Sequence, residues 1–200
     1  MRYGTDRKED SRRQIVELAS ERLRRDGIAG VGLRTIMTDA GLTHGAFYAH
    51  FKSRTELVAE ALRFALDQTR ERLERVAARA EPDDRLRAFV TFYLRQDHRA
   101  RAGTGCATAA LAPEIARLDA SIQRIFAEGL TALAGSVAGF LPEGGTPDER
   151  LSRGLAILAG LMGTLQLARA LPDGSPSDAL LESGRASAIA GAAAPWPSCR

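Results

Sequence analysis

An all-α fold is predicted by the spacing of apolar residues and by the lack of strand patterns in the sequence. Apolar residues recur at intervals of three and four, which is the spacing of one helix face. No segment alternates steadily between apolar and polar residues, and no hairpin signature occurs. The 200 residues, 44% of them hydrophobic, suffice to bury a core, either as one domain or as a compact unit followed by a larger one.

Three short helices are predicted at the N-terminal end. The first runs from about residue 11 to 26 and turns one apolar face, including Ile15 and Leu23, toward the core. The second spans residues 33–40 and ends at Gly41. The third spans residues 43–51, with Thr43 as its expected N-cap.

The rest of the chain is predicted to be helical as well. Residues 53–56 (Ser-Arg-Thr-Glu) form a capping box, which should begin a helix that reaches about residue 79. Further helices are expected over residues 83–96, 106–111, 113–141, 148–171 and 177–191. We therefore expect domains at residues 1–52 and 53–192, and a flexible tail at residues 193–200.

Composition argues against a disulfide-rich, secreted or membrane-spanning protein. The formal net charge of +3 permits nucleic-acid binding without indicating it, and two cysteines do not make a disulfide framework. The N-terminus lacks the apolar run of a signal peptide, and the apolar stretch at 155–170 is interrupted by polar residues. A cytoplasmic protein without a membrane partner is expected.

Catalytic and metal-binding signatures are not found in the sequence. There is no phosphate loop, no His-Glu-x-x-His pattern and no nucleophile elbow. The three histidines lack metal-ligand spacing, so no metal and no other cofactor is expected. We expect the protein not to be an enzyme; a small helical enzyme with a pocket in the C-terminal half is the alternative of another class.

Residues 33–51 predict a helix, a tight turn and a second helix. Gly41 lies where the chain must reverse, and Phe47 and Phe51 are four residues apart, so they should pack inward together. The opposite flank of the third helix then carries small residues, among them Gly45, and ends at Lys52. A helix with such a flank fits the major groove of DNA.

At these residues the chain resembles the DNA-binding domain of the tetracycline-repressor (TetR) family. The resemblance extends from about residue 15 to 62, and its most specific part is the segment 41–57, GLTHGAFYAHFKSRTEL. It implies an N-terminal three-helix helix-turn-helix domain and a C-terminal helical domain for ligand binding and dimerisation. One position departs from the family pattern: Gly32 stands where many members have a Ser or Thr that caps the second helix. We expect the loss of one phosphate contact there and no effect on the fold.

The resemblance also implies roles for single residues. Those expected to contact operator DNA are Arg34, Thr35, Thr43, His44, Gly45, Tyr48, His50 and Lys52. Tyr48 could instead be a packing aromatic, His50 could merely lie between helices, and His44 could be a bystander at the helix start. Because Gly and Ala line the groove face, part of the specificity is expected to come from DNA shape.

The C-terminal half is expected to bind a small apolar or electrophilic effector. The residues expected to line its pocket are Phe92, Tyr93, Cys106, Phe126, Met162 and Gln166. Most of them could simply be core residues. If Thr104 caps the helix that follows, Cys106 lies in its first turn, where the helix dipole favours a thiolate; the alternative is a small buried cysteine beside the pocket.

The resulting hypothesis is a homodimeric, sequence-specific repressor that an effector releases from its operator. The last two helices are rich in small residues, which would let them pair with those of a second copy. A nucleoid protein that binds DNA with little sequence preference is the second alternative.

Overall fold

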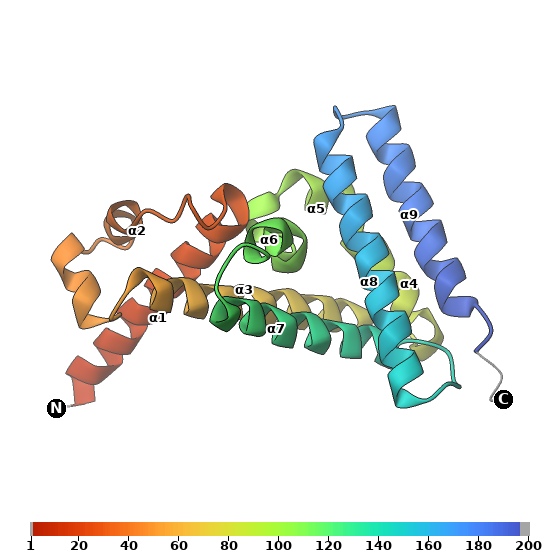
Figure 1. Ribbon diagram of the computed structural model, residues 1–200, viewed down its shortest axis with the longest axis horizontal. Coiled ribbons are helices and arrows are strands. Elements are labelled where there is room, and N and C mark those ends of the chain that lie inside the picture. The colour runs from red at the N-terminus through yellow and green to blue at the C-terminus, as the bar shows by residue number, and fades with distance from the viewer. Residues whose placement is uncertain (1, 197–200) are drawn as a thin grey trace. The chain divides into compact units, whose positions relative to one another are not determined.

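The computed structural model describes the backbone of residues 2–196 and the side chains of residues 7–196, and every regular element in this part is helical (Figure 1). The all-α prediction is confirmed. The α-helices are α1 (Arg2–Asp26), α2 (Leu33–Asp39), α3 (Arg54–Ala77), α4 (Arg85–Tyr93), α5 (Gln96–Ala100), α6 (Ala107–Ile115), α7 (Ala120–Gly139), α8 (Pro147–Ala170) and α9 (Ser175–Ala193). The 3-10 helices are η1 (His44–Ala49), η2 (Pro82–Asp84) and η3 (Ala102–Thr104).

The chain divides into two compact units. The first contains residues 1–67 and 102–126, and the second contains residues 68–101 and 127–200. The helices α3 and α7 therefore each contribute to both units. The boundary expected between residues 52 and 53 stays a prediction, and the first unit also includes α6.

The first unit has a continuous apolar core. It contains the predicted face of α1, with Ile15 and Leu23 almost fully buried, and the two phenylalanines of η1 and its C-terminal end. The rings of Phe47 and Phe51 stack with centroids 5.5 Å apart. α6 adds Leu111 to the same core, so a segment from the middle of the chain completes the N-terminal domain.

Two helices in or beside the helix-turn-helix segment differ from prediction. α1 begins at Arg2 rather than near residue 11, because no proline precedes residue 11 and Gly4 does not end the helix. The third helix is the short 3-10 helix η1, which needs only i to i+3 hydrogen bonds such as His50 N–H to the Phe47 carbonyl. Thr43 holds the N-cap position, but its side chain makes no capping bond.

The capping box that begins α3 is present in altered form. The Glu56 N–H donates to Ser53 Oγ over 3.1 Å, as predicted. The Glu56 carboxylate accepts from the Lys52 N–H at 2.7 Å, one residue before the expected donor. This bond is the largest cause that holds the pKa of Glu56 below its ordinary value.

Two predictions for the middle of the chain were wrong. Cys106 is itself the N-cap of α6, preceded by η3, so it does not lie within a first turn capped by Thr104. Pro113 lies inside α6 instead of restarting a helix. Proline removes one N–H donor, yet α6 continues to Ile115, and α7 begins anew after Asp119, whose carboxylate accepts from the Ser121 and Ile122 N–H groups.

The second unit is built around α8 and α9, which lie side by side (Figure 1). α8 begins at a complete capping box formed by Thr146 and Glu149. Gly184 on α9 allows the close approach, because a Cβ there would lie 2.5 Å from Thr164 Cγ2 on α8. Trp196, expected in a flexible tail, packs against the 144–145 turn and donates to the Glu143 carbonyl at 3.1 Å.

Among the described residues, α8 alone is long and apolar enough to cross a membrane by length and composition. Its best 18-residue window has a mean hydropathy of 1.3, and 33% of that window is buried within the chain. A core helix of a soluble protein meets the same criteria, so this is weak evidence for a membrane span.

Candidate nucleic-acid interface

The two sides of η1 differ sharply in exposure. Phe47 is fully buried, whereas the next residue, Tyr48, is 67% exposed. A Cβ built on Gly45 would have no atom within 4 Å. The flank that the sequence predicts to face DNA is therefore open within the described part of the chain.

The residues expected to contact DNA form one accessible set in the first unit. His50 is half-buried, and the others are exposed: Arg34, Thr35, Thr43, His44, Gly45, Tyr48 and Lys52. Their accessibility is compatible with contact to a duplex. Their individual roles stay predictions.

A tight turn orients η1 relative to α2. Gly41 has a φ of +69°, the left-handed region that glycine adopts without steric cost. The Leu42 N–H donates to the Met37 carbonyl at 2.8 Å, and the Gly41 N–H donates to the Thr38 carbonyl at 3.0 Å. These bonds satisfy carbonyl groups at the end of α2 while the chain reverses.

The start of α2 has no side-chain cap. Gly32 occupies the N-cap position with extended backbone. A Cβ there would have Thr35 Oγ1 as its nearest contact, at 3.4 Å. The N-cap position would therefore accept a serine without a clash. The hydroxyl that many TetR-family members have at this position is missing here.

The N-terminal part of α1 adds positive charge that the sequence analysis did not place at the interface. Burial lowers the pKa of His50, and the charges of Lys8 and Arg12 lower it further. The lysine is therefore within electrostatic range of the histidine. The sequence signal was the segment of mixed charge before residue 11, which a helix beginning near residue 11 leaves unassigned.

Arg12 holds the C-terminal end of this segment in place. Its guanidinium pairs with the carboxylates of Glu56 and Glu60 and lies 4.2 Å from the ring centroid of Phe51. The arginine thus joins α1, Phe51 in the segment after η1, and α3. This arrangement fixes the exposed flank against the first unit's own core.

The segment 102–115 is bonded to the C-terminal end of α1 and the loop that follows. Arg24 Nε donates to the Gly103 carbonyl at 2.7 Å, and the Ile28 N–H donates to Glu114 Oε2 at 2.8 Å. From the start of α3, Arg54 donates to the carbonyls of Ile28 and Val31. Displacement of η3 or α6 would therefore act directly on the helix-turn-helix domain.

Cys106 begins α6 within this contact region. It is 1% exposed, and its Sγ lies 2.7 Å from Thr108 Oγ1. The burial of Cys106 agrees with the alternative prediction, in which it is a small buried cysteine. The cysteine also follows closely on the η3 segment that bonds to α1.

The remaining residues expected to line an effector pocket are distributed over both units. Phe126 belongs to the first unit and is half-buried. In the second unit Tyr93 is fully buried, and the half-buried residues are Phe92, Met162 and Gln166. The pocket itself stays a prediction.

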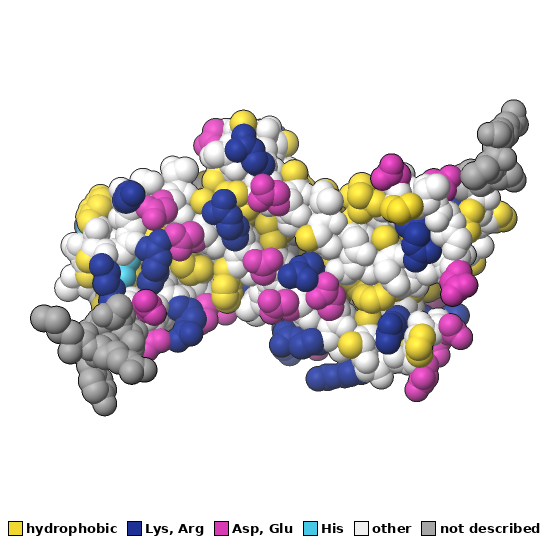
Figure 2. Space-filling view, turned by 90° about the horizontal axis from the view of Figure 1, so that it is seen from below, with side chains coloured by type: hydrophobic (Ala, Val, Ile, Leu, Met, Phe, Trp, Pro, Cys, Tyr) yellow, Lys and Arg dark blue, Asp and Glu magenta, His cyan; other side chains and the backbone are white. Residues whose placement is uncertain are grey.

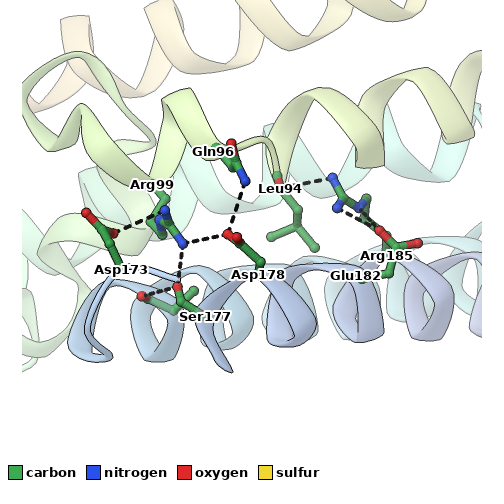
Figure 3. A network of polar contacts seen from close by, with 9 residues as sticks. Leu94, Gln96, Arg99, Asp173, Ser177, Asp178, Glu182 and Arg185 are labelled. Carbon is green, nitrogen blue, oxygen red and sulfur yellow. Dashed lines mark hydrogen bonds and ion pairs between the residues drawn. The ribbon is translucent and has the colours of Figure 1, made fainter. Parts of the chain in front are cut away.

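A polar network joins α5 to α9 in the second unit (Figure 3). Arg99 Nη1 donates to Ser177 Oγ at 2.7 Å and to Asp178 Oδ1 at 2.9 Å, and its Nη2 lies 3.1 Å from Asp173 Oδ1. Gln96 also donates to Asp178. The network fastens α5, the last helix before η3, to α9.

The surface charge is mixed. On the face drawn in Figure 2, Lys and Arg side chains are interspersed with Asp and Glu and do not gather into one basic field. This matches the small formal net charge of +3. Affinity for DNA would therefore depend on local contacts at the helix-turn-helix domain more than on a large positive surface.

The N-terminal part of the chain is similar in sequence to known bacterial regulators. Residues 15–61 match the family profile described as "Bacterial regulatory proteins, tetR family". Two regulators from Pseudomonas putida, the HTH-type transcriptional regulator TtgR and the probable HTH-type transcriptional regulator ArpR, are 34% and 35% identical over 86 residues. These alignments cover 43% of this chain and 40% and 39% of those proteins, so the chain spans about two fifths of their length.

Solved structures resemble nearly the whole chain. Escherichia coli NemR in its reduced form has a TM-score of 0.73 at 21% identity, covering 90% of this chain and 95% of that one. A TetR-family regulator from Cytophaga hutchinsonii has a TM-score of 0.76 at 17% identity, covering 92% and 96%. At these identities the likeness shows the fold. The chain is thus similar to the TetR family of bacterial regulators in sequence over residues 15–61 and in fold over most of its length.

Proposed function

We propose that this protein is a sequence-specific DNA-binding transcription regulator, most simply a repressor. The observation that carries the proposal is the open flank of η1, where Gly45 has no neighbour within 4 Å and Tyr48 is 67% exposed. An element held rigidly on its buried side and open on the other can enter the major groove. The exposed polar residues around it can donate to phosphates and set its register.

Selection of bound fragments from random DNA with the purified full chain tests this function. We expect one recovered site, and its affinity should exceed that of random duplex by at least about a thousandfold at moderate salt. Equal affinity for both would instead support a nucleoid protein. No binding to any duplex would refute the proposal.

We further propose that the active form is a homodimer that pairs through α8 and α9. α8 leaves much of its apolar surface open within the chain, including Leu167 at 60% exposure. Small residues on both helices, such as Gly160 and Gly191, would permit close approach of a second copy. A two-fold dimer would place its recognition segments about 34–36 Å apart, or a larger spacing of that order, and select a palindrome.

The dimer proposal is tested by Leu167→Glu, with Arg87→Glu as the control on an exposed position outside α8 and α9. Sedimentation should give a dimer for the parent and the control and a monomer for Leu167→Glu. A monomeric parent protein at micromolar concentration would refute the dimer without affecting the assignment of η1.

Release by an effector is proposed as a population shift. An effector in the helical domain lowers operator affinity only if it binds the released state more tightly. Two connections can carry the change: α3, which begins at the Ser53 cap, and η3, which bonds to α1 through Arg24. The burial of Cys106 favours a non-covalent ligand over an electrophile, because a reactive thiolate must be reached by its reagent.

Cys106→Ser separates these two modes of release. If an electrophile such as N-ethylmaleimide releases the parent protein and equally the serine variant, the thiol is not the switch. Loss of release in the variant alone would identify Cys106 as the sensor. In both cases operator binding without reagent should be retained.

A further inference from the structure

Two hollows meet around Arg85 in the second unit. One has a volume of ≈ 510 Å³ and lies among the start of α4, the end of α7 and the end of α9. The other has a volume of ≈ 370 Å³ and lies between α3 and α7. Arg85, Gly139 and Phe140 line both of them. None of the residues expected to line the effector pocket lines either hollow.

Arg85 brings an unused hydrogen-bond donor to this site. Its Nε is buried and has no hydrogen-bond partner among the described residues. A buried donor without a partner is costly, and a guanidinium matches a carboxylate in shape and charge. The Nε itself is closed to solvent, so an anion from outside the chain would reach Arg85 where its side chain lines the two hollows.

The nearby carboxylates are either engaged or exposed. Glu74 accepts from Arg70 at 3.0 Å and 3.1 Å and from Ser136 at 2.5 Å. Asp83 and Glu143 lie on the lining of the larger hollow but are exposed, where solvent and salt screen their charge.

The walls on either side of the guanidinium are largely apolar. Leu86, Phe140 and Ile189 come from three different parts of the chain and line the larger hollow. Its volume falls within the range of small-molecule sites, about 300–1,000 Å³. Arg87 also lines the larger hollow, but it is exposed and lies 3.8 Å from Asp84 Oδ1, so Arg85 is the half-buried cation of the site. Apolar walls beside one half-buried cation favour a molecule with a hydrocarbon body and a single negative end.

We propose that this site binds a medium-chain monocarboxylate, with the carboxylate on Arg85 and the hydrocarbon chain against Leu86, Phe140 and Ile189. The proposal does not depend on the proposed function, because it concerns ligand binding by the protein without DNA. It adds a second site at the end of the helical domain formed by α4, α7 and α9.

The chain carries its own reporter beside the site. Trp196 is the single tryptophan of the sequence. Its indole N–H donates to the carbonyl of Glu143, which lines the larger hollow. Occupancy of that hollow should therefore change the fluorescence of Trp196.

The test is titration of the full-length protein with decanoate and with its neutral analogue decanamide, both below their aggregation limits. Calorimetry gives the affinity, and Trp196 fluorescence gives the location. We expect saturable binding of decanoate and at least tenfold weaker binding of decanamide. Equal affinity for the two, or no saturable binding of decanoate, would overturn the proposal.

Two variants and a control assign the binding to this site. Arg85→Ala should weaken decanoate binding at least tenfold and leave decanamide binding nearly unchanged. Arg101→Ala, at an exposed position that lines neither hollow, should change neither. Ile189→Trp keeps the arginine and fills the larger hollow, so it should weaken the binding of both ligands. Circular dichroism on each variant verifies folding, and unchanged decanoate affinity in a folded Arg85→Ala protein would overturn the proposal.

Discussion

Gly41 and Gly45 lie four residues apart in the helix-turn-helix segment, yet we expect opposite consequences from replacing each with alanine. Gly41 has a φ of +69°, and a Cβ there would meet no atom within 4 Å. The cost of Gly41→Ala is thus conformational, about 1–2 kcal/mol of unfolding free energy for an L-residue in the left-handed region. Because the turn lies beside the DNA-facing flank and not on it, the folded fraction should keep its operator affinity.

Gly45→Ala should have the reverse effect. Gly45 has no positive φ, and the space around its Cβ position is empty. Alanine is therefore accommodated, and the free energy of unfolding should be unchanged or rise by about 0.4–1 kcal/mol, because the unfolded chain loses freedom. If the backbone at residue 45 approaches DNA closely, the added methyl group should weaken operator binding at least about tenfold, or about 1.4 kcal/mol.

The measurements are urea unfolding at a fixed protomer concentration and fluorescence anisotropy with the selected operator. Gly45→Leu extends the series, since a larger side chain on the same open flank should reduce affinity further without unfolding the protein. Full operator affinity in both Gly45 variants would refute close approach of this backbone to DNA. A stability loss in Gly45→Ala as large as that in Gly41→Ala would show that the flank is not open.

Other substitutions test separate parts of the same picture. Lys52→Ala should weaken binding to all DNA sequences alike and reduce the slope of log K against log salt by about 1, measured by anisotropy; a loss confined to one base position would contradict a phosphate contact. Gly32→Ser adds the missing cap to α2, so it should raise the unfolding free energy by a few tenths of a kcal/mol and tighten operator binding, and unchanged affinity would argue against a phosphate at this helix start. Burial lowers the pKa of His98 from 6.5 to about 4, so the unfolded chain takes up a proton that the folded chain refuses. Stability should then fall by roughly 3 kcal/mol as the pH falls from 6.5 to 4, and His98→Gln should lose less in urea titrations over this range. Arg99 is 11% exposed and Asp173 89% exposed, so Arg99→Ala should cost about 1–3 kcal/mol and Asp173→Asn less than about 0.5 kcal/mol; equal losses would contradict the difference in burial.

The sequence was a good guide wherever the signal is local. Gly41 has the positive φ that a sharp reversal requires, and Phe47 and Phe51 pack inward together as their spacing predicts. Ser53 caps α3, because a hydroxyl three residues before a glutamate is a local arrangement that needs no distant partner. The exposed side of η1 follows from the same spacing.

The sequence was a poor guide wherever a distant contact decides the outcome. Thr43 holds its predicted position but makes no capping bond, and the helix after it is a single short 3-10 segment. Pro113 does not interrupt α6, although proline usually ends a helix. Trp196 is anchored by Glu143, more than fifty residues away, a contact that no local pattern indicates.

By itself, the sequence determined the helical class, the helix-turn-helix segment and the side of it that faces outward, because periodicity, glycine and capping residues act within a few positions. Only the tertiary structure decided that residues 102–115 bond to α1, that Arg12 joins three elements and that Arg85 lies in a hollow with its Nε unpartnered among the described residues. Those features depend on which segments meet after the core forms. Pairing over such separations is set by the packing of the whole chain and leaves no periodic signal in the sequence.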